Sequence, residues 1–368
     1  MNYSELLQLA KGWSNFISDR IIIWRLLSKF VKNSSVSTDY DIVFVDECSM
    51  ISNSDMKKIL QKAKFKLIVL VGDTYQIESI NFGNWFDLAK FFIPRKSFYE
   101  LTKPYRAKNQ ELLDLWTKVR TMEEDITEHL VHFGYSSPLN ETIFERNVED
   151  EIILCLNYNG LYGINNINRF LQNRNLNQGE TWGLWTYKIN DPILFNEVDR
   201  FSPTIYNNLK GTIVNIAKEE NRIWFEIELD VVLNEWDVEE IDLELLEPRN
   251  PKKSIVGFWV YKKEENEDGS DGDITTLVPF QIAYAISIHK AQGLEYDSVK
   301  IVITEDIDEM ISHNIFYTAI TRARNILKIY WSPESMQQVI SGFDKSNVLS
   351  DANIFSAHSG LRILNRYL

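Results

Sequence analysis

The chain has 368 residues, of which 44% are hydrophobic, and a formal net charge of −14. This length and composition suffice for two or three domains with proper cores. The negative charge argues against a protein that coats nucleic acid through bulk electrostatics, because such proteins carry clustered Lys and Arg, although a local basic channel is compatible with it.

Two apolar runs near the N-terminal end predict the strands of a parallel sheet. Residues 1–40 carry apolar side chains near a 3.6-residue period and predict helices, including IIIWRLLSKF at residues 21–30. After a polar linker come Ile42 to Val45 and Leu67 to Val71, which are short, rich in Val and Ile, and uninterrupted by polar residues. Such runs are typical of strands buried on both faces of a parallel sheet.

Each of these runs ends in acidic residues. Asp46 and Glu47 close the first run, and Asp73 follows Gly72 after the second. Open α/β sheets bind ligands at the carboxyl ends of their strands, so we expect the active site there. An Asp-Glu pair can also simply cap a following helix. The second acidic strand end favours nucleotide hydrolysis, in which Asp46 holds hydrated Mg²⁺ directly or through water, Glu47 activates the attacking water, and Gln76 senses the γ-phosphate.

These segments resemble motifs of a known family. VDECSM (residues 45–50) resembles the Walker B segment, and GDTYQIESI (residues 72–80) the third motif, of superfamily 1 helicases, most closely the RecD-like and UvrD-like groups. ELTKPYR (residues 100–106) resembles the fourth motif, in which an Arg reaches across the domain cleft to the γ-phosphate. Arg106 holds that position, between a predicted short strand and a predicted helix from Asn109 to Arg120, although a lone Arg after Tyr is ordinarily a surface residue.

The phosphate-gripping loop of these helicases is missing. Gly-x-x-x-x-Gly-Lys-Ser/Thr cradles the nucleotide phosphates, and no Gly-Lys dipeptide occurs in this chain. The chain is then either the C-terminal portion of a longer helicase or a degenerate helicase-like protein that binds nucleic acid or a partner without turnover. A subunit that completes the site of another chain is a third alternative. The charged residues retained in the motifs favour the first alternative, the C-terminal portion of a longer helicase.

The pattern changes in the middle of the chain. Glu151 to Leu156 predicts another buried strand, and residues 158–175 resemble the opening of the second motor domain. From Asp191 to about Pro279, short alternating segments and turn formers replace the βα rhythm. This part resembles the Src-homology-3-like (SH3-like) insertion of RecD-like helicases, with Asn190 in place of the usual Gly. We expect a small β-barrel there, with an acidic hairpin tip at residues 264–273 and an open possibility of duplex splitting or a protein partner.

QIAYAISIHKAQGLEYDSVKIV (residues 281–302) resembles the fifth motif nearly throughout. A strand from Ile282 to Ile286 is expected to lead into a helix start with Ser287 as N-cap. By itself, His289 is more often a structural histidine. The resemblance implies two groups of contacts here: with the nucleic-acid strand at Ser287, His289, Lys290 and Gln292, and with the nucleotide at Gly293 and Glu295.

A strand from Ser298 to Thr304 precedes NIFYTAITRARNILKIYWS (residues 314–332), which resembles the sixth motif. The resemblance makes Arg322 the finger that neutralises charge on the transferred phosphoryl group. It also implies that Thr318 couples the cleft to the bound strand. Trp85, after the third motif, is a candidate for base stacking together with Phe82, although aromatic residues in such places are more often core.

We therefore expect an α/β fold with two RecA-like parallel-sheet domains, the first truncated, and an SH3-like β-barrel in the second. The function implied is ATP- and Mg²⁺-dependent movement along single-stranded DNA or at a single-strand/duplex junction, in DNA repair or recombination. The expected parts are 1–148 (first motor domain), 149–190 with 280–335 (second), 191–279 (barrel) and 336–368 (helical tail).

The remaining expectations concern the compartment. No apolar run reaches about 18 residues and no signal sequence opens the chain, so we expect neither a membrane span nor secretion by that route. Cys48 and Cys155 lie in or beside strand-like runs and lack the spacing of a metal site or a disulfide framework. This pattern predicts a protein of the reducing cytoplasm, with neither cysteine catalytic.

Overall fold

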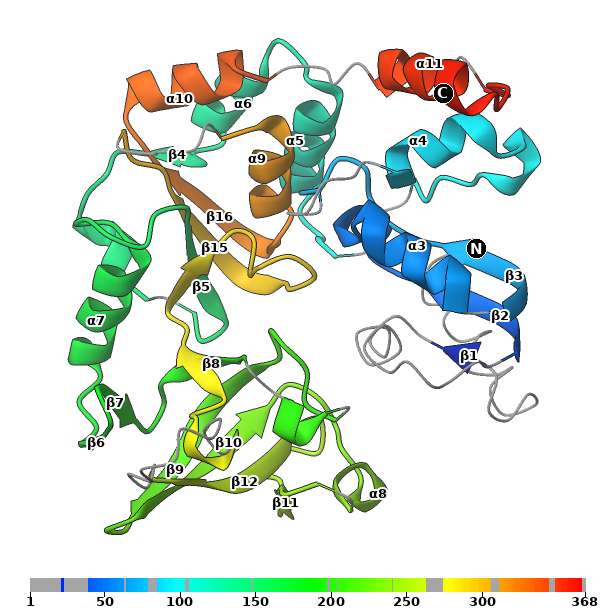
Figure 1. Ribbon diagram of the computed structural model, residues 1–368. Coiled ribbons are helices and arrows are strands. Elements are labelled where there is room, and N and C mark those ends of the chain that lie inside the picture. The colour runs from blue at the N-terminus through cyan, green and yellow to red at the C-terminus, as the bar shows by residue number, and fades with distance from the viewer. Residues whose placement is uncertain are drawn as a thin grey trace, which may run out of the picture. The chain divides into compact units, whose positions relative to one another are not determined.

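The protein is described by a computed structural model (Figure 1). It describes residues 21–22, 39–62, 64–78, 85–102, 106–146, 148–196, 199–202, 204–239, 241–262, 274–305, 311–343 and 348–365. The chain forms two compact units. The first unit comprises Met1–Tyr135, Met310–Asn325 and Pro333–Leu368, and the second comprises Ser136–Glu309 and Ile326–Ser332. Within the described residues, no helix is both long and apolar enough to cross a membrane.

The first unit holds a parallel sheet of three strands in the order β1-β2-β3. These strands are β1 (Ile21–Ile22), β2 (Asp39–Val45) and β3 (Lys64–Leu70). The two predicted parallel strands are thus confirmed, with Val43 opposite Ile68. The helix predicted at residues 21–30 is wrong at Ile21–Ile22, which pair with β2. The rest of that segment lies outside the described residues.

Burial on both faces, expected for both strands, does not hold for β3. Leu67 is 53% exposed, and none of the residues of β3 is fully buried. In the described sheet β3 has a neighbour on one side only, which explains the exposure. The core lies instead around β2, where Val43, Val45 and Cys48 pack against Ile51 and Ile59.

Helices account for much of the described remainder of the first unit. They are α3 (Asn53–Lys62), α4 (Trp85–Phe92), α5 (Gln110–Thr121), α6 (Ile126–His132), α9 (His313–Ile320), α10 (Pro333–Ser341) and α11 (Val348–Ser359), with short 3-10 turns at Cys48–Met50 and Arg95–Ser97. The helix predicted from Asn109 is confirmed as α5, because the Asn109 side chain caps it by accepting from Glu111 N–H. The short strand expected before Arg106 is not found in residues 98–102.

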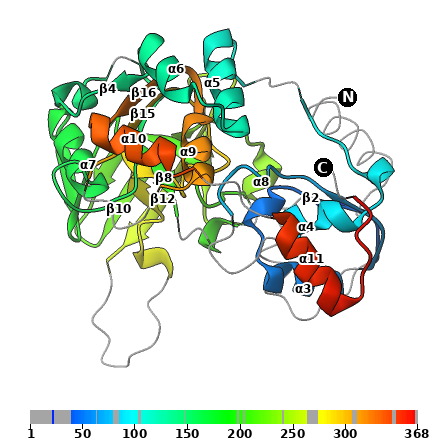
Figure 2. The ribbon, with the colours of Figure 1, turned by 90° about the horizontal axis from the view of Figure 1, so that it is seen from above.

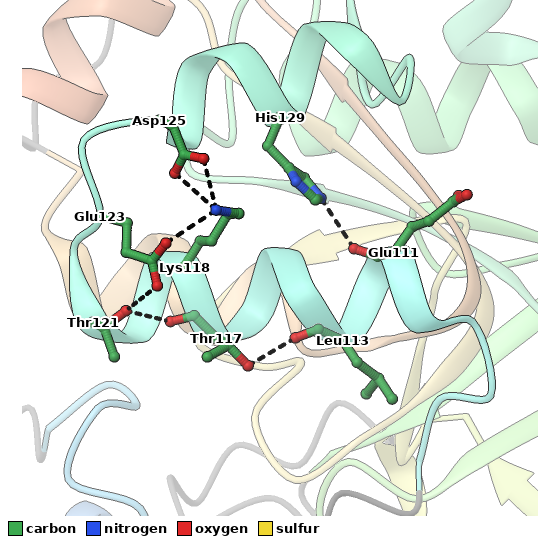
Figure 3. Close-up of polar contacts among 8 residues, drawn as sticks. All are labelled: Glu111, Leu113, Thr117, Lys118, Thr121, Glu123, Asp125 and His129. Atoms are coloured by element: carbon green, nitrogen blue, oxygen red, sulfur yellow. Dashed lines mark hydrogen bonds and ion pairs between the residues drawn. The ribbon is translucent and has the colours of Figure 1, made fainter.

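α5 and α6 form an antiparallel helical hairpin with polar cross-links (Figure 3). Lys118 Nζ at the end of α5 reaches both Glu123 and Asp125 ahead of α6, at 3.0 and 2.7 Å. His129 Nε2 on α6 donates to the Glu111 carbonyl at 3.1 Å. The lysine cross-link is exposed and contributes little stability, whereas the buried His129 fixes the packing of the two helices.

The C-terminal tail packs on α4, and both views draw α11 beside it (Figures 1 and 2). The Phe92 and Phe355 rings meet edge to face with centroids 5.4 Å apart. The Asn365 side chain donates to the carbonyls of Lys90 and Ile93, both at 2.7 Å. These are carbonyls at the C-terminal end of α4, which has no further helical turn to satisfy them. The tail therefore caps α4.

The second unit contains a five-stranded sheet in the order β14-β5-β15-β16-β4. Its strands are β14 (Ala285–Ser287), β5 (Glu151–Cys155), β15 (Tyr296–Val302), β16 (Ala323–Tyr330) and β4 (Ser136–Ser137), with α7 (Ile164–Arg174) and a 3-10 turn at Glu141–Phe144 beside them. β5 runs parallel to β14 and to β15, and all its residues are buried. The predicted strands at Glu151 to Leu156 and Ser298 to Thr304 are confirmed within one or two residues.

The second unit also holds an antiparallel six-stranded sheet in the order β11-β12-β10-β9-β8-β13. Its strands are β8 (Pro192–Phe195), β9 (Lys210–Lys218), β10 (Arg222–Leu229), β11 (Glu244–Leu246), β12 (Ser254–Tyr261) and β13 (Phe280–Ile282). A hairpin of β6 (Gly179–Trp182) and β7 (Trp185–Lys188) precedes it, and α8 (Glu235–Val238) and 3-10 turns at Asp199–Phe201 and Ile274–Thr276 accompany it.

The expected closed barrel is not found. Among the described residues, the end strands β11 and β13 do not pair with each other, so the sheet is open. Alternating side chains predict a sheet with one buried face, here lined by Phe225, Phe258 and Phe280. Closure depends on the pairing of the end strands, which alternation does not encode. The expected acidic hairpin tip at residues 264–273 lies outside the described residues.

A buried carboxylate joins the two sheets of the second unit. Asp191 is fully buried and accepts hydrogen bonds from Tyr284 Oη at 2.8 Å and Gln172 Nε2 at 2.6 Å. Burial raises the pKa of Asp191. The preceding Asn190 has φ of +69°. This left-handed conformation suits Gly and tolerates Asn, which explains how Asn replaces the usual Gly there.

Candidate active site

The two carboxylates after β2 sit on a strained turn. Glu47 has φ of +51°, a left-handed conformation rarely adopted by Glu. Its N–H donates to Asp46 Oδ1 at 2.9 Å. Neighbouring backbone bonds hold this turn to β3, because Cys48 N–H donates to the Val71 carbonyl at 2.9 Å. Strain of this kind persists only where the surroundings enforce it, and it is concentrated at functional sites.

The segment after β3 is a tight turn organised by Asp73. Its carboxylate accepts from Tyr75 N–H at 3.0 Å and from Gln76 Nε2 at 3.3 Å. Within the described residues, Gln76 Oε1 is buried without a hydrogen-bond partner. Asp73 engages one of the two amide N–H groups, so the second N–H can donate to a phosphate and the amide oxygen can accept from a water molecule.

Gly72 leaves no room for a side chain. A Cβ at this position would lie 2.8 Å from Phe86 of α4 and 3.0 Å from the Cys48 nitrogen. Real Cβ atoms essentially never approach another atom as closely as the 2.8 Å to Phe86, and the 3.0 Å to the Cys48 nitrogen is tighter than nine in ten real Cβ contacts. Glycine therefore lets the acidic turn after β3 pack directly against the turn that carries Glu47.

Two arginines approach from other parts of the first unit. Arg106 Nη1 donates to the Thr321 carbonyl at 2.7 Å. Arg322 is 1% exposed, and its Nε and Nη2 donate to the Thr318 carbonyl and to Thr321 Oγ1, both at 2.9 Å. Both guanidinium groups are thus anchored at the C-terminal end of α9.

The carboxylates and arginines of this site influence one another's pKa values. Burial raises the pKa of Glu47, and the charge of Asp46 raises it further. The positive charges of Arg322 and Arg106 act on the same pKa in the opposite direction. Burial lowers the pKa of Arg322 to about 10, with Arg106 lowering it and Glu47 opposing the change. Side chains from β2, the Asp73 turn, the Arg106 segment and α9 therefore share one charged cluster.

The donor set suits a magnesium nucleotide better than a protein-enclosed metal. In the described part of the chain, no group of three or more His, Cys, Asp or Glu side chains is arranged to hold a metal ion. Mg²⁺ at nucleotide sites is commonly held by one or two carboxylates together with water and substrate phosphates. Asp46 with the neighbouring Glu47 and Asp73 fits that mode.

Neither cysteine has the properties of a nucleophile. Cys48 and Cys155 are free and buried. Burial raises the pKa of the Cys48 thiol to about 12 and also raises that of Cys155. A thiol that stays protonated at neutral pH is a poor nucleophile, which agrees with the expectation from the sequence.

The fifth-motif loop lies in the second unit. Ser287 Oγ accepts from Lys290 N–H at 3.2 Å, and Ala291 N–H donates to the Ser287 carbonyl at 3.1 Å. These contacts make turns instead of the expected helix. The expected strand from Ile282 to Ile286 is also wrong as one element, because β13 ends at Ile282 in the antiparallel sheet and β14 begins at Ala285 in the parallel sheet.

The predicted contacts of this loop differ in exposure. Ser287 and Gln292 are buried, and His289 and Lys290 are half-buried. Lys290 Nζ donates to Gln281 Oε1 at 2.6 Å. Gly293 is exposed with φ of +76°, which explains the glycine. Glu295 is half-buried, and its backbone carbonyl accepts a hydrogen bond from Lys210 Nζ at 3.0 Å.

Thr318 and Trp85, predicted to contact nucleic acid, have other contacts in the structure. Thr318 is 0% exposed, and its Oγ1 accepts from Ile77 N–H at 2.9 Å. The half-buried Trp85 donates from its indole to the Ile51 carbonyl at 2.7 Å and packs edge to face with Phe86. Phe82 lies outside the described residues.

Sequence reasoning missed several residues around the Gln76 turn. Asn314 Nδ2 donates to the Gln76 carbonyl at 3.1 Å. Arg120 on α5 lies 4.6 Å from the centroid of the Tyr75 ring. Asn314 and Tyr75 fall inside matched motifs, so the motif was a signal for them, but nothing in the sequence pointed to Arg120.

Comparison with known families and proteins agrees with the motifs. Residues 282–330 match the UvrD-like helicase C-terminal domain, and residues 11–134 match an AAA domain. The chain is 26% identical to the ATP-dependent DNA helicase Pif1 of Campylobacter jejuni, over 89% of this chain and 76% of that protein. It is 21% identical to the RecBCD enzyme subunit RecD of Mycolicibacterium smegmatis, over 85% of this chain and 54% of that protein.

Solved structures support the fold. A Bacteroides Pif1 bound to single-stranded DNA is similar with a TM-score of 0.55 and 13% identity, over 97% of this chain and 92% of that one. A Pif1 structure described with forked double-stranded DNA gives a TM-score of 0.53 and 14% identity over the same shares. In its motifs and matched relatives the chain is therefore similar to superfamily 1 helicases of the Pif1 and RecD type, and the solved Pif1 structures share its fold.

Proposed function

We propose that this chain carries the hydrolytic part of an ATP-dependent DNA helicase or translocase. The observation that supports this most directly is the charged cluster of the first unit. There the Glu47 carboxylate interacts electrostatically with Asp46, Asp73, Arg106 and Arg322, and Arg322 interacts with Glu47, Asp73 and Arg106. Carboxylates that activate water, combined with arginines that stabilise phosphoryl charge, are the working parts of nucleotide hydrolases.

The local geometry suggests a role for each side chain. The raised pKa of Glu47 brings this carboxylate closer to the working range of a general base at neutral pH. Gln76 Oε1, buried and without a partner, is placed to accept a hydrogen bond from the attacking water. Arg322, held by two hydrogen bonds, offers a preorganised positive charge. Mg²⁺, held by Asp46 directly or through water, would neutralise phosphate charge.

The DNA-binding part of the proposal rests on the second unit. We assign Ser287, His289, Lys290 and Gln292 to the path of single-stranded DNA or a single-strand/duplex junction, and Gly293 and Glu295 to the nucleotide. The half-buried Lys290 and the open backbone at Gly293 support this assignment. A Pif1 relative has been solved with single-stranded DNA, which makes this strand the natural first ligand to test.

A second candidate function follows from one sequence fact. The chain contains no Gly-Lys dipeptide, so it lacks the usual phosphate cradle. A helicase-like module that binds nucleic acid or a protein partner without ATP turnover is compatible with this absence. The intact set of charges at the carboxylate edge favours the hydrolase.

ATP turnover with and without single-stranded DNA separates these candidates. The assay compares this chain with one extended upstream, wherever the reading frame continues to a Gly-Lys-Ser/Thr loop. We expect turnover that depends on the loop and rises with DNA. If both chains bind DNA and neither hydrolyses ATP, the module is correct and the hydrolase proposal fails.

Lys290 tests the proposed DNA path. Replacing Lys290 by Gln is expected to weaken binding of a single-stranded oligonucleotide and to reduce the slope of log K against log salt by about 1, because one phosphate contact is lost. Lys290→Arg should retain most of the binding. Lys252→Gln, at an exposed turn before β12, removes the same charge and serves as the control. Equal salt slopes for the two Gln variants would exclude Lys290 from the path.

A further inference from the structure

Helix α9 holds the peptide unit that follows Gln76. Asn314 Nδ2 donates to the Gln76 carbonyl at 3.1 Å, and Ile77 N–H donates to Thr318 Oγ1 at 2.9 Å. Asn314 and Thr318 are four residues apart and therefore lie on one face of the helix. The peptide unit that follows Gln76 is thus fixed at its carbonyl and at its N–H by two side chains of a single helix.

Thr318 also orients the buried arginine. The carbonyl of Thr318 accepts from Arg322 Nε at 2.9 Å, while its hydroxyl serves Ile77. Thr318 is 0% exposed, so both contacts are shielded from water. The hydroxyl of Thr318 is therefore hydrogen-bonded to the Gln76 turn, and its carbonyl is hydrogen-bonded to the guanidinium group of Arg322.

An aromatic cluster reinforces the same contact. The Tyr75 ring meets the rings of His313 and Tyr317 at centroid distances of 6.3 and 6.1 Å, both edge to face. The guanidinium group of Arg120 lies over the Tyr75 ring, 4.6 Å from its centroid. His313 Nε2 in turn donates to the Val119 carbonyl at 2.7 Å and ties α9 to α5. The Gln76 turn is thus held by side chains as well as by backbone bonds.

We propose that Thr318, with Asn314, is a positioning residue that sets Gln76 and Arg322 relative to each other. A shift of either group on loss of the γ-phosphate would then be passed to the other through Thr318. The proposal rests on the proposed hydrolase function for the roles of Gln76 and Arg322. It assigns Thr318 to the nucleotide machinery and not to the nucleic-acid path expected from the sequence.

The free acceptor on Gln76 supports a positioning role over a purely structural one. A buried polar atom without a partner destabilises a fold, and Gln76 Oε1 has no hydrogen-bond partner among the residues that the structure describes. Nevertheless, the Gln76 carbonyl and the Ile77 N–H are satisfied by α9, and one of the two Nε2 hydrogens is directed to Asp73. The backbone next to Gln76 and one side of its amide are thus fixed, while the amide oxygen is left available.

Amide hydrogen exchange tests the contact without requiring activity. Thr318→Val keeps the shape and removes the acceptor, and Thr318→Ser keeps the acceptor. We expect Val to speed exchange in the peptide covering residues 73–78 by about tenfold, as for the loss of one buried hydrogen bond, while Ser changes it little. Exchange in β15, in the other unit, checks that the fold is intact. Asn314→Ala, at a half-buried position, should speed the same peptide with less risk to folding.

Kinetic measurements then distinguish a positioning role of Thr318 from a purely structural role. In a chain that hydrolyses ATP, Thr318→Val should lower kcat with KM and single-stranded DNA affinity little changed, and Thr318→Ser should restore kcat. A Val variant that loses DNA affinity and keeps its exchange pattern would overturn the proposal in favour of a DNA contact.

The two proposals can fail separately. If the chain extended to a Gly-Lys-Ser/Thr loop never hydrolyses ATP, the hydrolase function is wrong, and the exchange data alone decide whether α9 fixes the Gln76 turn. If exchange in residues 73–78 is unchanged in both Thr318→Val and Asn314→Ala, the positioning role is wrong whatever the activity.

Discussion

Replacing Arg322 by alanine is expected to lower the rate of ATP hydrolysis by on the order of 10³- to 10⁵-fold, in a chain that turns ATP over. Arg322 is 1% exposed and held by the Thr318 carbonyl and Thr321 Oγ1, so its charge is preorganised. A charge fixed in a site shielded from water stabilises the transition state more than one that must first be oriented. Single-turnover hydrolysis with saturating nucleotide measures the effect.

Two further variants sharpen the Arg322 experiment. Arg322→Lys keeps the charge but loses the planar fork that makes two hydrogen bonds, so we expect little recovery. Arg324→Ala removes a half-buried arginine two residues further along the chain, in β16, and should change the rate little. Circular dichroism and nucleotide binding confirm that each variant is folded. Unaltered hydrolysis in Arg322→Ala would contradict its assignment as the finger.

The second large effect is expected for Glu47→Gln, which should abolish turnover and spare nucleotide binding. The amide keeps the size and hydrogen-bonding capacity of the side chain and removes its ability to take a proton from water. Nucleotide affinity and single-turnover rate, measured on the same preparation, check both halves of the prediction. Persistent turnover would assign the base to another group.

The same variant should be more stable than the wild type at neutral pH. Because burial raises the pKa of Glu47 above 4.5, the folded chain binds this proton more readily than the unfolded chain. The resulting stabilisation is fully present below pH 4.5 and is lost as pH rises through the raised pKa. Gln avoids the cost of the buried charge, so we expect a higher Tm at neutral pH and no gain below pH 4.5.

Asp55→Asn provides a comparison, because its expected change in Tm at neutral pH has the opposite sign. Hydrogen bonds from Lys58 and Ser52 lower the pKa of Asp55 below 3.8. Its ionised form therefore stabilises the fold above that pH, and the neutral Asn should slightly lower Tm at neutral pH. A Glu47→Gln variant that loses stability as Asp55→Asn does would show that burial does not dominate at Glu47.

Sequence patterns located the acidic edge because its signals are local. An apolar run that ends in acid encodes both the strand and the group at its end, as in Val45 and Asp46 or Val71 and Asp73. The helix beginning beside Asn109 was likewise predictable from its cap and its periodicity. These features depend on neighbouring residues and need no knowledge of distant contacts.

Features that depend on distant pairing were missed. Ile21–Ile22 form a strand because β2 lies beside them, although their sequence has a helical period. The run from Ile282 to Ile286 divides between two sheets because β8 and β5 each take one end. The contacts of Thr318 involve Ile77, 241 positions away. The local sequence of each of these segments does not indicate which distant segment it contacts.

The tail on α4 has a practical consequence for the design of shorter chains. Asn365 reaches the Lys90 carbonyl across 275 positions of sequence. α4 begins at Trp85 and carries Phe86, which fills the space over Gly72. Removing the residues around Asn365 to aid expression or crystallisation would therefore loosen a helix that covers the candidate site. Asn365 belongs to the scaffold of that site, and an affinity tag is better placed away from it.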